Sequence, residues 1–128
     1  MELLWRLPLG LVGGLIALWT FPTENIWILA PIMVVIIAAS VTGASFWAAN
    51  LVGFVAGMTF YISHIEWISQ YLGPLPLIAL SVLQSIFFAL GLGAWAFLYN
   101  RLSKQKGFST PLVLSLIFAS LWTSREWL

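Results

Sequence analysis

The sequence contains no cysteine, which excludes disulfide bonds, thiolate metal sites and a cysteine nucleophile within these 128 residues. It contains one histidine, His64, so a histidine-based metal site is not expected either. No nucleophile–base pair and no phosphate-binding loop is recognisable. We therefore expect neither a metal ion nor a cofactor, and we assign no catalytic residue.

Charge is also scarce. Charged residues make up 7% of the chain and hydrophobic residues 62%, whereas soluble domains carry roughly 25% charged residues. A core of this size cannot hide so much apolar surface. The net charge of +1 is too small to indicate nucleic-acid binding. The composition therefore predicts an all-α, polytopic transmembrane helix bundle in a single membrane domain, 1–128.

Turn signals divide the chain into about five apolar spans. Proline or glycine interrupts the pattern near Pro22, Gly43 and Gly73, and a basic stretch follows Arg101. The last span stops at Leu128 without a polar tail, so we expect the chain to be a piece of a longer protein. The predicted spans cover 3–21, 26–41, 45–69, 75–102 and 111–128.

The basic residues predict the orientation. If the N-terminus is cytoplasmic, the loops at 23–25 and 64–74 face outward and contain no Lys or Arg. Cytoplasmic loops of membrane proteins are enriched in these residues. This arrangement places four basic residues on the cytoplasmic side: Arg6, Arg101, Lys104 and Lys106.

Small residues recur every four positions on the third and fourth spans, and this spacing lets two helices approach closely. Gly10 and Gly14 form a similar motif on the first span. Asn50 and Gln84 lie near mid-span, where we expect each to make an interhelical hydrogen bond. The two stripes that we expect to pack together are Ala49, Gly53 and Gly57, and Ser81, Ser85, Ala89 and Gly93.

Polar and aromatic side chains gather at the predicted outer ends of the spans. Ionisable groups are costly in a membrane and often functional, but aromatic residues at span ends also simply mark the lipid–water interface. On a continuous helix Glu66 points about 200° away from His64, which disfavours a catalytic pair. Arg125 could bind a lipid phosphate or form an interfacial ion pair. The candidate outer-face lipid contacts are His64, Glu66, Trp67, Tyr71, Arg125 and Glu126.

These patterns alone leave a membrane anchor and a small transporter fragment open. A transporter predicts a polar path through the spans, and only Asn50, Gln84 and a few hydroxyl groups are available for one.

The order of motifs adds a resemblance to a family. LWTFP followed by IWILAP resembles the opening of bacterial apolipoprotein N-acyltransferases, and FWAANLVGFVAG is similar to their third span. LGPLP and the apolar run after it look like the actinobacterial branch. LWTSREWL resembles the motif W-x-x-x-E-(F/W)-L of this family. These segments lie at 18–22, 26–31, 46–57, 72–91 and 121–128.

The resemblance implies the N-terminal membrane part of an enzyme of lipoprotein maturation in the bacterial inner membrane. Family members transfer an acyl chain from a membrane phospholipid to the N-terminal cysteine of a lipoprotein, so these two would be the partners. An extracytoplasmic nitrilase-like domain carries the family's Glu-Lys-Cys triad. That domain has no counterpart in these residues, so we expect the chain not to be catalytic by itself.

Two departures keep an alternative open. The third span begins with Ser45-Phe46-Trp47 and lacks the basic residue that the family usually has nearby, and the sequence stops before the family's R-G. A related membrane region anchors or partners polyprenol-phosphate mannose synthases in some actinobacteria. The chain could be such a non-catalytic anchor.

Overall fold

The computed structural model describes residues 1–20, 26–105 and 111–124. Within these residues the chain forms six helices and no strand, as the composition predicted. The helices are α1 (Leu3–Trp19), α2 (Leu29–Val41), α3 (Phe46–His64), α4 (Trp67–Leu72), α5 (Pro74–Leu102) and α6 (Pro111–Ser124).

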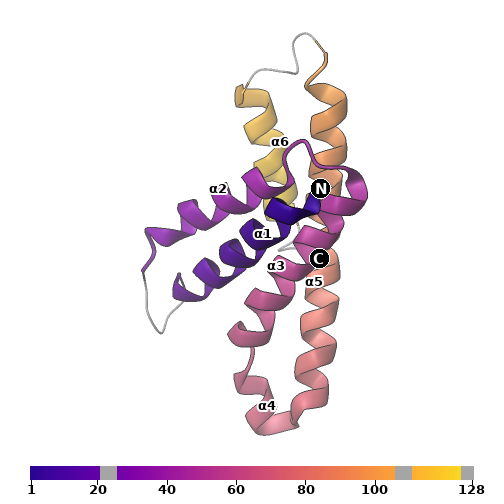
Figure 1. The fold of residues 1–128 in the computed structure, drawn as a ribbon. Helices are drawn as coiled ribbons and strands as arrows, with labels where there is room; N and C mark the ends of the chain where they lie inside the picture. The colour runs from indigo at the N-terminus through magenta and orange to yellow at the C-terminus, as the bar shows by residue number, and fades with distance from the viewer. Residues whose placement is uncertain (21–25, 106–110, 125–128) are drawn as a thin grey trace.

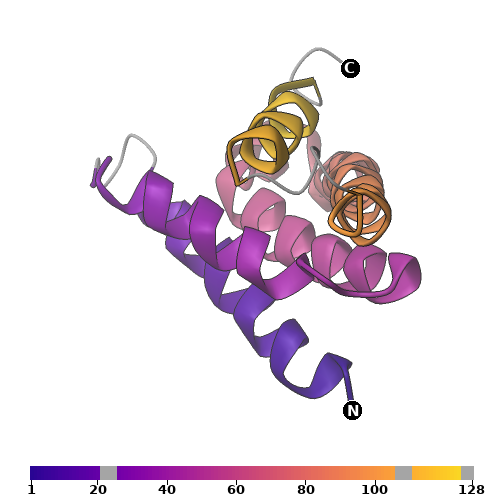
Figure 2. The same cartoon turned by 90° about the horizontal axis from the view of Figure 1, so that it is seen from above.

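Helix α3 is the centre of the bundle (Figure 1). It packs along the long helix α5 on one side and against α1 on the other. The hairpin of α1 and α2 projects sideways from this pair, and the view from above shows α6 beside α5, away from α1 (Figure 2). Helix α6 packs through aromatic rings, with Phe118 against Trp95 and Trp122 against Phe88.

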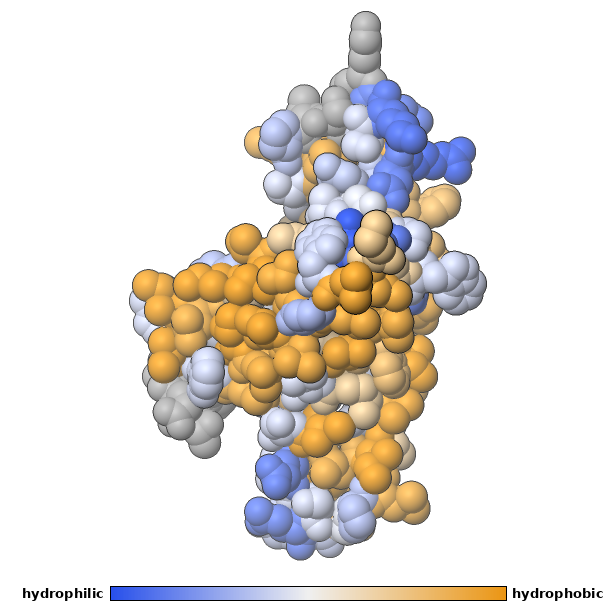
Figure 3. All heavy atoms as spheres, viewed as in Figure 1, coloured by the Kyte–Doolittle hydropathy of each residue, from blue (hydrophilic) through white to orange (hydrophobic). Residues whose placement is uncertain are grey.

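The surface is that of a membrane protein. Figure 3 shows hydrophilic residues over the end of α5 and over α4, with a broad hydrophobic band between them. Helices α3 and α5 are long and apolar enough to cross a membrane, and α1, α2 and α6 are shorter apolar helices. Together these features make the fold an all-α membrane helix bundle.

Small residues set the spacing of the central helices, and the predicted contact between the two stripes is confirmed. A Cβ atom on Gly53 would lie 2.9 Å from the Cα atom of Ala89. On the other side of α3, a Cβ atom on Gly14 would lie 2.6 Å from the carbonyl oxygen of Ala56. Both contacts are backbone against backbone, so no side chain could move aside to make room. Helix α3 is therefore in close backbone contact with α5 on one face and with α1 on the other.

The prediction of interhelical hydrogen bonds was wrong for Asn50. Its amide donates to the carbonyl of Phe46, one turn back on its own helix, at 2.8 Å. Such bonds to the preceding turn are the local alternative for a short polar side chain. The amide also fills the space beside Gly93. Gln84 lies on the exposed surface of α5.

The stretch predicted as one helix from 45 to 69 is interrupted. Helix α3 ends at His64, and Ile65 leaves helical geometry with φ −107° and ψ 16°. The next amides bond three residues back, from Ile68 to Ile65 and from Ser69 to Glu66, which tightens the turn before α4. The angle of about 200° between the His64 and Glu66 side chains, which assumed a continuous helix, therefore does not apply to this segment.

The other helix limits differ less from the predicted spans. Helix α2 begins at Leu29 rather than at residue 26, after a turn in which the Leu29 amide donates to the Ile26 carbonyl. Helix α5 matches its span to within one residue, because Gly73 adopts φ 83° and Pro74 starts the helix. The predicted ends at residues 21 and 128 lie outside the described residues.

Candidate functional site

A cavity of about 450 Å³ lies between the α1–α2 hairpin, α3, α5 and α6. Ligand sites typically have volumes of roughly 300–1,000 Å³, so this one has room for a small ligand or part of a larger one. The lining residues are Gly14 and Ala17 of α1 with the following Thr20, Ala30, Met33, Val34 and Ile37 of α2 with the preceding Trp27, Ala56, Phe60, Tyr61 and His64 of α3, Phe88 of α5 and Trp122 of α6.

The cavity exists because small side chains line its walls where the helices meet. Gly14 lets α1 lie directly on the backbone of Ala56. Ala17 and Ala30 also line the space and leave it unfilled. The remaining wall is aliphatic and includes Met33 and Val34.

One end of the cavity is aromatic and polar. Thr20 is the C-cap residue of α1 and His64 is the last residue of α3, so both helices bring a polar side chain to the same end. The Thr20 hydroxyl donates to the carbonyl of Ala17 at 2.7 Å. The His64 imidazole stacks on the Phe60 ring with centroids 4.9 Å apart. The site thus combines a mainly apolar body with one end that carries polar and aromatic side chains.

The structure brings only one of the described candidate residues into this cavity. His64 lines it, whereas Glu66 lies exposed in the turn before α4. Trp67 and Tyr71 are 58% and 79% exposed on α4, with ring centroids 6.4 Å apart in an edge-to-face pair. The last two candidates, Arg125 and Glu126, lie outside the described residues.

Sequence reasoning missed most of the lining. Met33, Val34 and Thr20 look like any other residues of the predicted spans. The available signal was the set of small residues Gly14 and Ala17 one turn apart on α1, which marks a face where bulk is missing. Among the described residues, no three His, Cys, Asp or Glu side chains are placed to hold a metal ion.

The chain is similar to proteins of a known family. The family model described as the apolipoprotein N-acyltransferase N-terminal domain matches residues 13–128. The chain belongs to this family. An apolipoprotein N-acyltransferase of Photobacterium profundum is 28% identical to it over 130 residues. No solved structure matches the chain.

The match to the apolipoprotein N-acyltransferase family confirms the resemblance seen in the sequence and covers every residue that lines the cavity. The Photobacterium alignment covers 97% of this chain but 25% of that relative, so the chain spans a quarter of its length. The extreme N-terminus, with Glu2 and Arg6, precedes the residues that match the family model.

Proposed function

We propose that the chain is the N-terminal membrane part of an apolipoprotein N-acyltransferase and acts in lipoprotein maturation. In this reaction an acyl chain passes from a phospholipid to the N-terminal cysteine of a lipoprotein. The family match across residues 13–128 supports this assignment. These 128 residues contain no cysteine to act as the thiolate nucleophile, so we propose that the chain alone is not catalytic.

The observation that carries the proposal is the cavity. An acyl chain of a phospholipid would lie along Met33, Val34 and Ile37, and its polar end would lie near Tyr61 and His64. Apolar walls with a few polar groups at one end are what such a ligand requires. We propose that Trp67 and Tyr71 contact lipid beside this end, and that Arg125 and Glu126, which lie outside the described residues, also contact lipid.

We further propose a multi-pass arrangement in the bacterial inner membrane with a cytoplasmic N-terminus. The five spans would be α1, α2, α3 with α4, α5, and α6. Arg101 lies in the last turn of α5 and Lys104 follows it, and the enrichment of Lys and Arg in cytoplasmic loops supports a cytoplasmic location for that end. The polar end of the cavity would then open toward the outer leaflet.

Two proteins, expressed in cells depleted of their own acyltransferase, test the function. One is the chain alone, and the other is a chimera in which the chain replaces the matching quarter of the Photobacterium enzyme. We expect triacylated lipoprotein, measured by mass spectrometry of the N-terminal peptide, from the chimera only. Rescue by the chain alone would contradict the assignment of the chemistry to another domain. An inactive chimera at normal membrane abundance would contradict the family role.

A matched pair of substitutions on α2 tests the cavity in the same chimera. Ala30→Trp would fill the cavity, whereas Ala39→Trp adds the same side chain on the exposed face of the same helix. We expect Ala30→Trp to raise the KM for phospholipid at least tenfold, the effect of about 1.4 kcal/mol of lost binding. Equal kinetics for both variants would show that the acyl chain binds elsewhere.

A further inference from the structure

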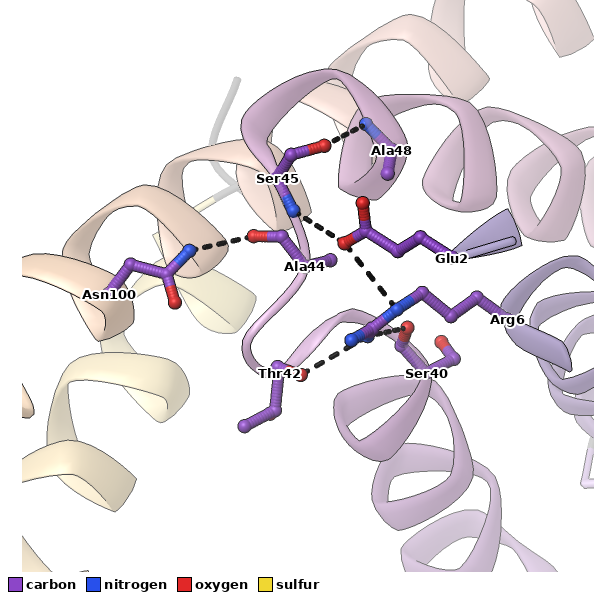
Figure 4. A network of polar contacts seen from close by, with 8 residues as sticks. All are labelled: Glu2, Arg6, Ser40, Thr42, Ala44, Ser45, Ala48 and Asn100. Atoms are coloured by element: carbon purple, nitrogen blue, oxygen red, sulfur yellow. Dashed lines mark hydrogen bonds and ion pairs between the residues drawn. The ribbon is translucent and has the colours of Figure 1, made fainter. Parts of the chain in front are cut away.

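Polar contacts from two sides converge on the short loop between α2 and α3 (Figure 4). The loop follows Val41 and ends at Ser45, the N-cap residue of α3. A loop at this point joins the C-terminal end of one helix to the N-terminal end of the next. Both ends carry backbone groups that lack a partner within their helix.

Arg6 supplies donors to the C-terminal end of α2. Its Nη1 atom donates to the carbonyl of Ser40 at 2.7 Å and to the carbonyl of Thr42 at 3.1 Å. The residue is 7% exposed, and its guanidinium carbon also lies 4.3 Å from the centroid of the Trp5 ring. A cation at a helix C-terminus complements the helix dipole. Arg6 is therefore a buried cap supplied by another helix.

Glu2 makes the complementary contact with α3. Its Oε1 atom accepts from the backbone amide of Ser45 at 2.8 Å and lies 3.6 Å from Nε of Arg6. A carboxylate is favoured at a helix N-terminus for the same reason that a cation is favoured at a C-terminus. The positive charge of Arg6 thus lies at the C-terminal end of α2, and the negative charge of Glu2 lies at the N-terminal end of α3. Both residues belong to the N-terminal end of the chain at α1, which therefore links these two helix ends.

Helix α5 holds the loop from the opposite side. The indole Nε1 of Trp95 donates to the Thr42 hydroxyl at 3.2 Å, and the Asn100 amide donates to the carbonyl of Ala44 at 2.8 Å. Ala44 and the neighbouring Val41 are fully buried. The N-terminal ends of α1 and α3 and the C-terminal ends of α2 and α5 are therefore joined around one loop.

The opposite half of α2 has a different environment. Its residues Ala30, Met33 and Val34 line the cavity. Near the start of α2, the Ile26 amide donates to the Trp19 carbonyl within the same hairpin at 3.1 Å. Because a helix moves as a rigid element, we expect a shift at the C-terminal end of α2 to change the distance between this half and α5.

We propose that Glu2 and Arg6 are positioning residues, a clamp that holds α2 at the separation from α5 that keeps the cavity open. Glu2 and Arg6 precede residues 13–128, the part of the chain that the family model matches. The expected effect of the clamp on lipid binding rests on the proposed function, whereas its expected effect on the position of the helices does not. Loss of the clamp loosens the C-terminal end of α2, while α1, α3 and α5 stay together through their glycine contacts.

The test measures two distances in the 128-residue chain in lipid nanodiscs. Because the chain has no cysteine, spin labels can be attached to introduced cysteines without background labelling. One pair joins Ile32 on α2 to Leu83 on α5, and the other joins Leu51 on α3 to Leu83, all at exposed positions. Double electron–electron resonance gives both distance distributions.

We expect Arg6→Gln to shift and broaden the Ile32–Leu83 distribution and to leave the Leu51–Leu83 distribution unchanged. Arg6→Lys should restore part of the parent distribution, because it keeps the charge but not the fork of donors. Arg101→Gln, which removes an exposed cation from α5, should change neither distance. A purely structural role would disturb both distances together.

Glu2→Gln keeps the test decisive if Arg6→Gln fails to fold. The amide oxygen of glutamine can still accept from Ser45, so only the charge is lost, and we expect a smaller shift in the Ile32–Leu83 distance alone. An unchanged Ile32–Leu83 distance in every folded clamp variant would overturn the proposal. A clear shift together with unaltered phospholipid binding would retain the clamp and reject the lipid role of the cavity.

Discussion

Replacing Gly57 by alanine tests the packing on which the bundle depends. An added Cβ atom would lie 3.0 Å from both the Cα and the Oγ atoms of Ser85. Carbon atoms in favourable contact are about 3.5–4.0 Å apart. Because the Cα atom of Ser85 belongs to the backbone, the clash cannot be relieved by a rotamer change. Helices α3 and α5 would have to separate.

Gly91→Ala is the matched control, because an added Cβ atom there meets nothing within 4 Å. Both substitutions gain the same helix preference of alanine over glycine, roughly 0.5–1 kcal/mol. Overpacking of a filled interface costs about 1–3 kcal/mol. The difference between the two variants isolates that term, so we expect Gly57→Ala to be less stable than Gly91→Ala by about 1–3 kcal/mol. Gly57→Leu, with a larger side chain, should be less stable still.

The measurement is a titration of the purified chain from mild detergent into SDS, followed by tryptophan fluorescence. Parent, Gly57→Ala and Gly91→Ala are compared under identical conditions. We expect Gly91→Ala to unfold at or above the parent midpoint and Gly57→Ala below it. Coincident midpoints for the two variants would refute the conclusion that the glycine stripe of α3 is a close-packed interface.

Two further predictions concern the membrane. Single cysteines at Gln70 and Lys104 should be labelled by an impermeant reagent from outside and from inside the cell, respectively; external labelling at Lys104 in intact cells would reverse the orientation. In the complete enzyme, Trp67→Ala and Arg125→Ala should each weaken phospholipid binding, seen as a raised KM, while Glu24→Ala should not. If all three substitutions leave the kinetics alike at matched amounts of folded protein, the outer residues only set the depth of the helices.

The helices and the contact between the two small-residue stripes could be predicted from the sequence because both depend on local patterns. Gly53 faces Ala89 because small residues at a spacing of four form a flat face on each helix. Pro74 begins α5 because proline suits the first turn of a helix. Both features can be recognised from residues that lie within one segment of the sequence.

The clamp and the cavity could not be predicted in the same way. Arg6 was recognised only as a charge that sets orientation, yet it is buried against carbonyls 34 and 36 residues away. The cavity depends on where Met33 and Val34 lie relative to α5, which no periodicity specifies. The interruption at Ile65 occurs without glycine or proline, the residues that usually announce one.

The most direct test of the central claim is the amount of phospholipid that the purified chain retains. Intact-complex mass spectrometry from nanodiscs should detect bound phospholipid on the parent and on Ala39→Trp, but much less on Ala30→Trp, which fills the cavity. Equal retention by Ala30→Trp and Ala39→Trp would contradict the claim that the cavity between α2 and α5 receives an acyl chain.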